Sequence, residues 1–173
     1  AYTFGNIFIY LLFPSKSKID IFEKILLGFI FYGFSILFLN FFTSINVIIN
    51  SIFIIFSIIF VIFFKKKYLI KILKLIVASS LIVLFLISYS KINDPDAFLY
   101  HLPYTQILNE QKIIFGLSNL HFRFGTISLE QYINAGNFNF NKNPGIIISS
   151  ASIFSIIFMK IFINIYNHLK KIK

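Results

Sequence analysis

The chain has 173 residues, of which 58% are hydrophobic and 13% are charged, and its formal net charge is +10. A soluble domain is typically about half apolar and about a quarter charged, so this composition excludes an ordinary soluble protein and indicates that lipid surrounds most of the chain. The sequence has no cysteine, which excludes both a disulfide framework and a metal site built on thiolates.

The excess of lysine does not indicate a nucleic-acid-binding protein. The lysines flank apolar runs, and neither a base-reading motif nor a stripe of stacking aromatic residues lies between them. Lysines at the ends of apolar runs are typical of the cytoplasmic side of membrane proteins. We therefore expect the lipid bilayer, and no nucleic acid, to be the partner of this basic chain.

The first apolar run, residues 4–13, is too short to cross a bilayer. Pro14 ends it, so we interpret the run as the last half of a spanning helix. The chain starts at Ala1, and no basic segment of a signal peptide precedes the run. We therefore expect the sequence to be a fragment of a longer protein.

Four later apolar runs are long enough to cross about 30 Å of hydrocarbon as α-helices. Asp20 and Glu23 stand at the start of the first of these runs, where carboxylates complement the helix dipole. The predicted spans cover residues 21–42, 47–64, 70–90 and 146–165.

The lysine-rich connections all fall on one side of the predicted spans, and this side is expected to be cytoplasmic. The long loop on the other side then faces outward, into the periplasm if the protein lies in a bacterial inner membrane. The sequence predicts an all-α polytopic transmembrane helical bundle with an outer loop of amphipathic interfacial helices. Its three regions are the N-terminal transmembrane helices in 1–90, the extracytoplasmic loop in 91–144, and the last spanning helix with its basic cytoplasmic end in 145–173.

Two amphipathic helices are predicted in the loop, at the membrane surface. The first begins with Asp94 as its N-cap and Pro95 as its first helical residue. Pro103 kinks or restarts this helix, which continues to Gln111, and Gly116 stops it.

The second predicted helix of the loop begins at Ser118 and is interrupted at Gly125. It restarts at Ser128, which forms a capping-box pattern with Gln131. Gly136 and the polar run 137–144 close it.

The groups able to do chemistry gather in the loop. Asp96 can act as a general base on an acceptor hydroxyl or help to hold a divalent cation; its alternative role is a second carboxylate beside the N-cap, where it stabilises the helix dipole. Asp94 is the better cap. The sequence contains neither a Gly-rich phosphate loop nor a zinc-binding histidine pair with a third ligand. No metal ligands are therefore assigned, and a divalent cation at Asp96 is the one cofactor that the sequence leaves open.

The loop also holds the only arginine, Arg123, and two of the three histidines, His101 and His121. Arg123 with His121 can clamp a phosphate or pyrophosphate, because guanidinium donates in a planar fork; an arginine that reaches toward lipid phosphate is the alternative. His101 can shuttle protons or bind phosphate, or else make one structural hydrogen bond. Tyr100 lies one helical turn after Asp96, and Glu130 is either a second functional carboxylate or part of a solvated helix face.

The order of these residues resembles a known group of enzymes. A spanning helix is followed by the run Asp-Ala-Phe-Leu-Tyr-His-Leu-Pro at 96–103, by Arg-Phe-Gly at 123–125, and by another spanning helix. This arrangement resembles the first outer loop of GT-C-type integral membrane glycosyltransferases, the group that includes RgtA/B/C/D-like and dolichyl-phosphate-mannose mannosyltransferase-like proteins. The resemblance covers about residues 75–165.

The resemblance implies that the carboxylate at the start of the loop, Asp96, is catalytic. It implies a polyprenyl-phosphate sugar as donor and a glycan, lipid or protein on the outer face as acceptor, with Arg123 and His101 as candidates for the donor phosphate. The substrate-binding candidates are Asp94, Tyr100, His101, His121, Arg123 and Glu130. Two other readings stay open: an O-antigen polymerase or ligase-like protein, which relies more on arginine and histidine, and a non-enzymatic transporter or membrane subunit.

Overall fold

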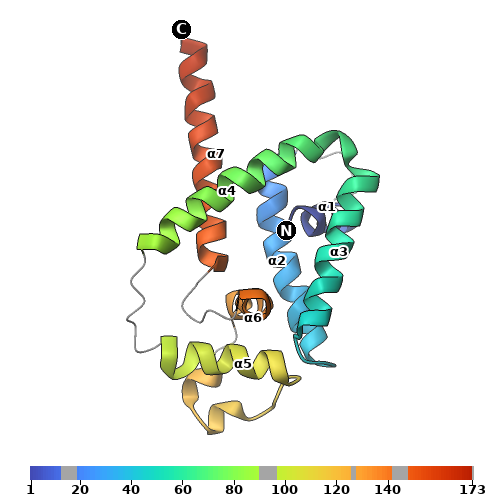
Figure 1. Cartoon of the computed structure of the whole chain (residues 1–173), viewed down its shortest axis with the longest axis vertical. Coiled ribbons are helices and arrows are strands. Elements are labelled where there is room, and N and C mark those ends of the chain that lie inside the picture. The colour runs from blue at the N-terminus through green and yellow to red at the C-terminus, as the bar shows by residue number, and fades with distance from the viewer. Residues whose placement is uncertain (13–18, 90–96, 126–127, 142–147, 173) are drawn as a thin grey trace.

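The computed structural model describes residues 1–12, 19–89, 97–125, 128–141 and 148–172, and all regular structure in these ranges is helical. Four helices in these ranges are long and apolar enough to cross a membrane, as predicted from the four apolar runs. They are α2 (Ile21–Asn40), α3 (Val47–Phe64), α4 (Leu69–Tyr89, continuous with the short turn Lys66–Tyr68) and α7 (Ile148–Ile172). Figure 1 shows them as long rods, with the C-terminal end of α7 extending beyond the others.

The starts of α2 and α3 follow directly from their sequences. Asp20 is the N-cap of α2 and forms a full capping box with Glu23: the backbone N–H of Glu23 donates to Asp20 Oδ1 at 2.8 Å, and the backbone N–H of Asp20 donates to Glu23 Oε2 at 3.1 Å. Asn46 caps α3 by accepting the backbone N–H of Ile49 at 3.1 Å. Asp20 thus fixes the start of α2, and Asn46 ends the tight connection between α2 and α3.

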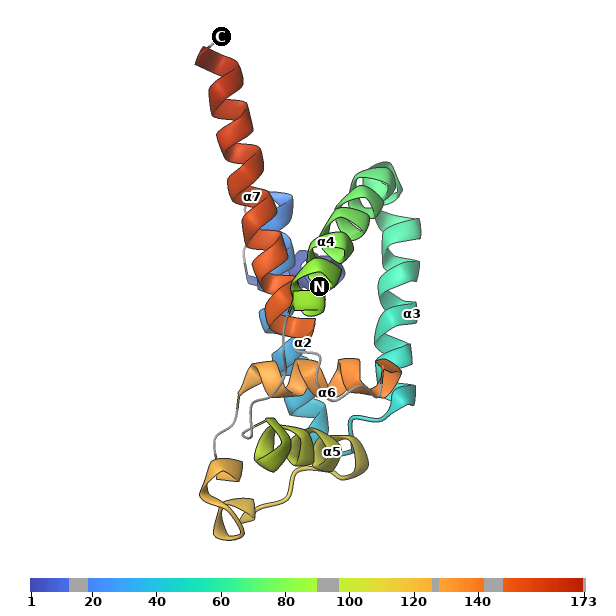
Figure 2. The same cartoon turned by 60° about the vertical axis from the view of Figure 1, so that its left-hand side comes forward.

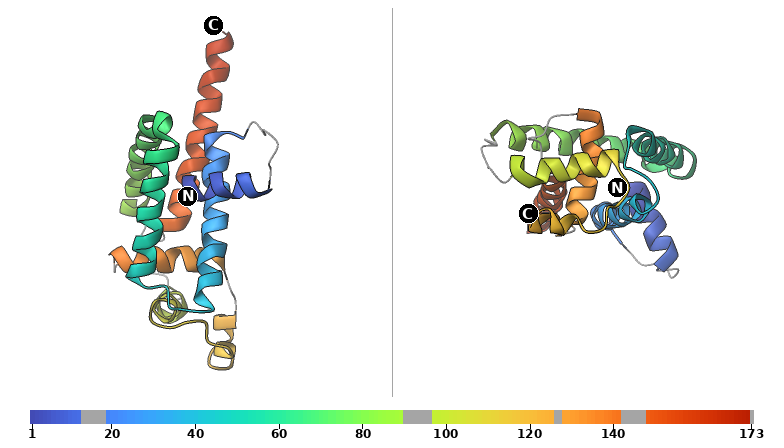
Figure 3. Two further views of the ribbon diagram at one scale, coloured as in Figure 1. Left: turned by 90° about the vertical axis from the view of Figure 1, so that its right-hand side faces the viewer. Right: turned by 90° about the horizontal axis from the view of Figure 1, so that it is seen from below.

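The helix α1 (Tyr2–Leu12) is a short apolar helix that lies across α2, as the left-hand view of Figure 3 shows. Glycine permits the crossing. A Cβ atom added at Gly5 would overlap the backbone carbonyl of Lys24, and one added at Gly28 would overlap the carbonyl of Ala1. The two backbones therefore touch, as small residues allow in membrane proteins.

The outer segment differs in part from its prediction. A π-helical turn, Ala97–His101, leads into α5 (Leu102–Glu110), so Pro103 restarts the helix as expected. Only two short 3₁₀ turns, Leu117–Asn119 and Phe122–Gly125, replace the predicted helix from Ser118, which is therefore wrong. Gly116 takes the left-handed conformation, with φ of 87°, where the chain turns.

The last helix of the outer segment is α6 (Leu129–Asn141), which continues through Gly136 and ends inside the polar run 137–144 that was predicted to close it. It lies crosswise between the long helices and α5 (Figure 2) and contacts α2, α3, α5 and α7. Tyr132 and Ala135 are completely buried. Protein therefore covers the apolar face that the sequence predicts to rest on lipid.

The described residues form two apolar cores. One core lies where α2, α5 and α6 meet near the α2–α3 connection, and the other joins α2 to α7, with α4 packed against it. The first consists of Ile36, Ile45, Tyr104, Leu108, Tyr132 and Ala135, and the second of Phe22, Ile156 and Met159.

Candidate functional site

The π-helical turn before α5 and the 3₁₀ turn Phe122–Gly125 bring four of the predicted site residues together. The guanidinium carbon of Arg123 lies 4.6 Å from the centre of the Tyr100 ring, within the range of a cation–π contact. The rings of Tyr100 and His121 are stacked, with centroids 6.5 Å apart and planes 14° apart, and the His101 ring centroid is 4.2 Å from that of Tyr100. We call Tyr100, His101, His121 and Arg123 the aromatic–arginine cluster.

Pro103 explains why the helix before α5 is a wider π-helical turn, Ala97–His101. It has no N–H to donate, and its ring clashes with the preceding turn of a regular α-helix. A π-turn relieves that clash, and such turns are frequent at functional sites. The hydroxyl of Thr105 donates to the carbonyl of His101 at 2.8 Å and fixes the junction.

Each histidine of the cluster has a polar neighbour at its Nδ1 atom. His121 Nδ1 accepts the backbone N–H of Arg123 at 3.3 Å, so a neutral His121 carries its proton on Nε2. His101 Nδ1 lies 3.5 Å from Nε2 of Gln131, on the first turn of α6. Both imidazoles are exposed, whereas Tyr100 and Arg123 are half-buried.

Gln131 is a residue of this neighbourhood that the sequence analysis assigned only to a cap. Its Oε1 accepts the backbone N–H of Ser128 at 3.3 Å, as the capping-box pattern predicts, and its amide nitrogen faces His101. The side chain thus ties the start of α6 to the aromatic–arginine cluster. The spacing of 30 residues between Gln131 and His101 left no local signal of this contact.

Glu130 lies next to Gln131 in sequence, but its side chain contacts the start of α7. Its Oε1 accepts the hydroxyl of Ser149 at 3.2 Å and that of Ser150. These bonds join the start of α6 to the start of α7. The structure therefore brings Glu130 to a helix junction and not to the aromatic–arginine cluster.

Asp94 and Asp96 lie outside the described residues, and their predicted roles stay predictions. Asp96 directly precedes Ala97, where the described π-turn of the cluster starts. Among the described residues, no group of three His, Asp or Glu side chains is placed to hold a metal ion. The donors brought together in that part of the chain are cationic and aromatic, which suits an anionic oxygen ligand such as phosphate.

A charged residue within the last span was missed by the sequence analysis. Lys160 of α7 donates to Glu23 Oε1 at 2.8 Å and forms an ion pair with Asp20 Oδ2 at 3.3 Å. Although partial burial works against the charged form, the backbone N–H of Glu23 and the ammonium of Lys160 hold the pKa of Asp20 below its usual value. This triad joins α7 to the N-terminal end of α2.

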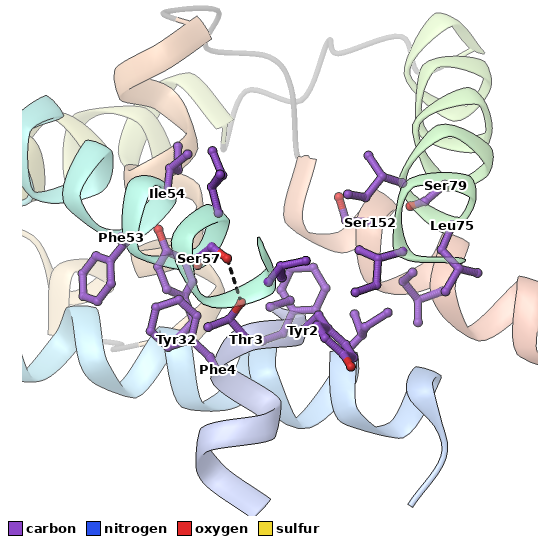
Figure 4. A pocket seen from close by; sticks show the side chains of 18 of the residues that line it. Tyr2, Thr3, Phe4, Tyr32, Phe53, Ile54, Ser57, Leu75, Ser79 and Ser152 are labelled. Carbon is purple, nitrogen blue, oxygen red and sulfur yellow. Dashed lines mark hydrogen bonds between the residues drawn. The ribbon is translucent and has the colours of Figure 1, made fainter. Parts of the chain in front are cut away.

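A cavity of about 650 Å³ lies among α1, α2, α3, α4, α6 and α7 (Figure 4). Its walls are mostly aliphatic and aromatic, and Tyr32, Phe53 and Leu75 are among them. The hydroxyl of Thr3 donates to the backbone carbonyl of Ser57 at 3.3 Å, so its hydrogen bond is satisfied at the wall.

In the part of the chain that the structure describes, the fold and the site define a helical protein with four helices able to span a membrane and a cationic aromatic cluster at one end of them. The chain belongs to the family described as a domain of unknown function (DUF8201), which matches residues 1–173. No curated protein matches the chain. No solved structure matches it either.

Proposed function

We propose that the chain is part of an integral membrane glycosyltransferase that moves a sugar from a polyprenyl-phosphate donor to an acceptor hydroxyl on the outer face of a membrane. The observation that carries this function is the aromatic–arginine cluster, which lies at one end of the apolar helices and whose first two residues belong to the π-helical turn that directly follows Asp96. A donor of this kind has a lipid tail and a phosphate head, so it needs a cationic group beside a membrane-spanning segment.

The proposed reaction divides the work between a carboxylate and the cluster. Asp96 accepts the proton of the acceptor hydroxyl while the hydroxyl oxygen attacks the anomeric carbon. The bond between that carbon and the phosphate oxygen breaks with inversion, and its electron pair leaves with the lipid phosphate. Arg123 and the two histidines stabilise the charge that grows on this phosphate.

The orientation follows from the lysines. The connection 65–67 and the end of α7, with Lys170 and Lys171, carry the basic residues of one side, which we assign to the cytoplasm. The aromatic–arginine cluster then faces the periplasm of a bacterial inner membrane, where the lipid-linked donor and its glycan, lipid or protein acceptor meet.

The first test is sugar transfer in membranes that contain the intact protein. Asp96→Asn keeps the size of the side chain and removes the base, so transfer should fall at least about 100-fold, the usual contribution of a positioned base. Glu110→Gln removes an exposed carboxylate from the end of α5 and should retain activity. Normal transfer by a well-expressed Asp96→Asn protein would exclude the base role.

An O-antigen polymerase or ligase-like activity is the second candidate, and the contact between Arg123 and the Tyr100 ring favours it. An enzyme of that kind depends on arginine and histidine rather than on a base. Arg123→Ala should then abolish activity while Asp96→Asn retains it, and the transferase predicts the opposite order of severity. Arg123→Lys keeps the charge but loses the planar fork, and it separates loss of charge from loss of bidentate geometry.

A further inference from the structure

The cavity extends from Ile133 and Asn137 on α6 to the lysine-rich end of the α3–α4 hairpin. Its walls include Ser57, Val61 and Ile62 on α3, and Leu69, Ile72 and Ile76 on α4. These segments directly flank the connection between the two helices. Figure 1 shows this connection and α5 at opposite ends of the long helices.

The walls of the cavity favour a hydrocarbon ligand. None of its lining residues is Asp, Glu, Lys, Arg or His. The lining is mostly aliphatic and aromatic, with the hydroxyls of Thr3 and Ser57 and the amide of Asn137 among it, and its volume is that of ordinary ligand pockets, about 300–1,000 Å³. It lies beside α3 and α4, whose spanning windows are each only 6% buried by the described protein. The aliphatic chain of a membrane lipid can therefore reach it from the bilayer.

The lysines that adjoin two wall segments of the cavity in sequence favour an anionic head group. Lys65, Lys66 and Lys67 stand between the wall segment that ends at Ile62 and the one that begins at Leu69. Lys71 and Lys74 follow on the first turns of α4. A run of lysines at a membrane surface attracts anionic lipids within a Debye length, so the head group and the tail of one molecule would meet complementary parts of the protein.

We infer that this cavity is a lipid-binding site, which takes one acyl chain of an anionic phospholipid from the lysine-side leaflet and holds its phosphate at Lys65–Lys67. The site is separate from sugar transfer and does not depend on it. Its phosphate position, at the connection between α3 and α4, lies at the end of the long helices opposite to α5.

Tryptophan fluorescence can test the site because the sequence contains no tryptophan. Phe29→Trp places a probe in the cavity wall on α2, and Phe38→Trp places a matched probe on the exposed, lipid-facing side of the same helix. Each variant is reconstituted in phosphatidylcholine vesicles with a minor fraction of lipid that carries bromine on its acyl chains. The bromine is carried either by phosphatidylglycerol or by phosphatidylcholine with the same chains.

The ratio of quenching by the anionic and the neutral brominated lipid cancels differences in depth between the probes. We expect the anionic lipid to quench the Phe29→Trp probe at least about threefold more, and the two lipids to quench the Phe38→Trp probe equally. Replacing Lys65, Lys66 and Lys67 by Gln should bring the cavity ratio to about one. Replacing Lys170 and Lys171 by Gln, at the far end of α7, should leave this ratio unchanged.

Two results would overturn the inference. Equal quenching of the Phe29→Trp probe by both lipids would mean that the site does not select an anionic head group. Quenching of the Phe38→Trp probe alone would mean that lipid does not enter the cavity and that another protein segment fills it. Each variant is first checked for a single symmetric peak in size-exclusion chromatography in detergent. If the Phe29→Trp protein does not fold, Phe53→Trp, at a second wall position, replaces it.

Discussion

Asparagine side chains replace missing backbone hydrogen bonds where the chain turns. Asn40 is fully buried, and its amide donates to the carbonyls of Thr43 at 3.2 Å and Gln111 at 3.1 Å. Asn139 donates to the carbonyl of Ile45 at 2.6 Å. Buried carbonyls need such partners because water is excluded from them. The side chains of α2 and α6 therefore tie the outer segment to the α2–α3 connection.

Two buried tyrosines give the first core a dependence on pH. Burial raises the pKa of Tyr132, and the neighbouring Tyr104 adds to this rise; burial also raises the pKa of Tyr104. A group whose pKa is higher in the folded protein stabilises it below its unfolded pKa, here 10.0, and this contribution is lost as the pH rises further.

The free energy of unfolding in detergent should therefore fall as the pH rises above 10.0, and Tyr132→Phe should make that fall shallower. Thermal unfolding midpoints measured between pH 8 and 11, by circular dichroism, provide the check. Tyr166→Phe is the control, because Tyr166 is 60% exposed on α7. An identical pH profile for wild type and Tyr132→Phe would contradict the role of burial at this residue.

The aromatic–arginine cluster could be predicted only in part. The sequence indicates that Tyr100, His101, His121 and Arg123 belong to one polar loop, because they interrupt a chain that is otherwise apolar. The sequence does not predict the contact between Arg123 and Tyr100, because two separate turns of the backbone bring these two residues together. The contact of Gln131 with His101 and the ion pair of Lys160 were missed for the same reason: the partners are 30 and 137 residues away.

At the scale of elements, apolar length and polar caps are enough to predict the long helices, because a span needs about 20 apolar residues. The first residues of α2 and α3 follow from their N-caps, Asp20 and Asn46. The continuation of α6 through Gly136 does not follow from local preference. A Cβ atom at Gly136 would lie 2.9 Å from Asn50 Oδ1 and 3.0 Å from the Tyr32 hydroxyl, so the glycine serves a close tertiary contact and not a helix end.

The crossing of α1 and α2 provides a test at this scale. Gly5→Ala and Gly28→Ala each place a methyl group against the backbone of the other helix, which must move away. We expect a cost of at least about 1–3 kcal/mol, as in overpacked cores. Gly33→Ala on the same α2 helix is the matched control, since its new Cβ would find Ile133 and Leu129 at the ordinary distance of 3.4 Å.

Thermal unfolding in detergent measures these three variants side by side. The midpoints of Gly5→Ala and Gly28→Ala should be clearly lower than that of wild type, and the midpoint of Gly33→Ala should be close to it. Equal midpoints for all three variants would show that α1 does not pack on α2 through its glycines.

At the scale of the whole molecule, the proposed orientation can be tested with single cysteines, because the sequence contains none. Lys112→Cys and Lys170→Cys both replace exposed lysines, one after α5 and one near the end of α7. A maleimide that cannot cross membranes should label Lys112→Cys on intact cells. It should label Lys170→Cys only after the cells are broken. The reverse pattern would place the aromatic–arginine cluster on the cytoplasmic side and exclude transfer on the outer face.

The helix α6 serves several neighbours at fixed positions along its length. Gln131 faces His101 at one end, Gly136 accommodates Asn50 and Tyr32 in the middle, and Asn139 binds Ile45 near the other end. Inserting one residue between Gln131 and Gly136 would rotate everything beyond it by about 100° and shift it by about 1.5 Å. An insertion within α6 should therefore be far more damaging than a substitution on its exposed side, because its rotational phase is set by partners from three separate parts of the chain.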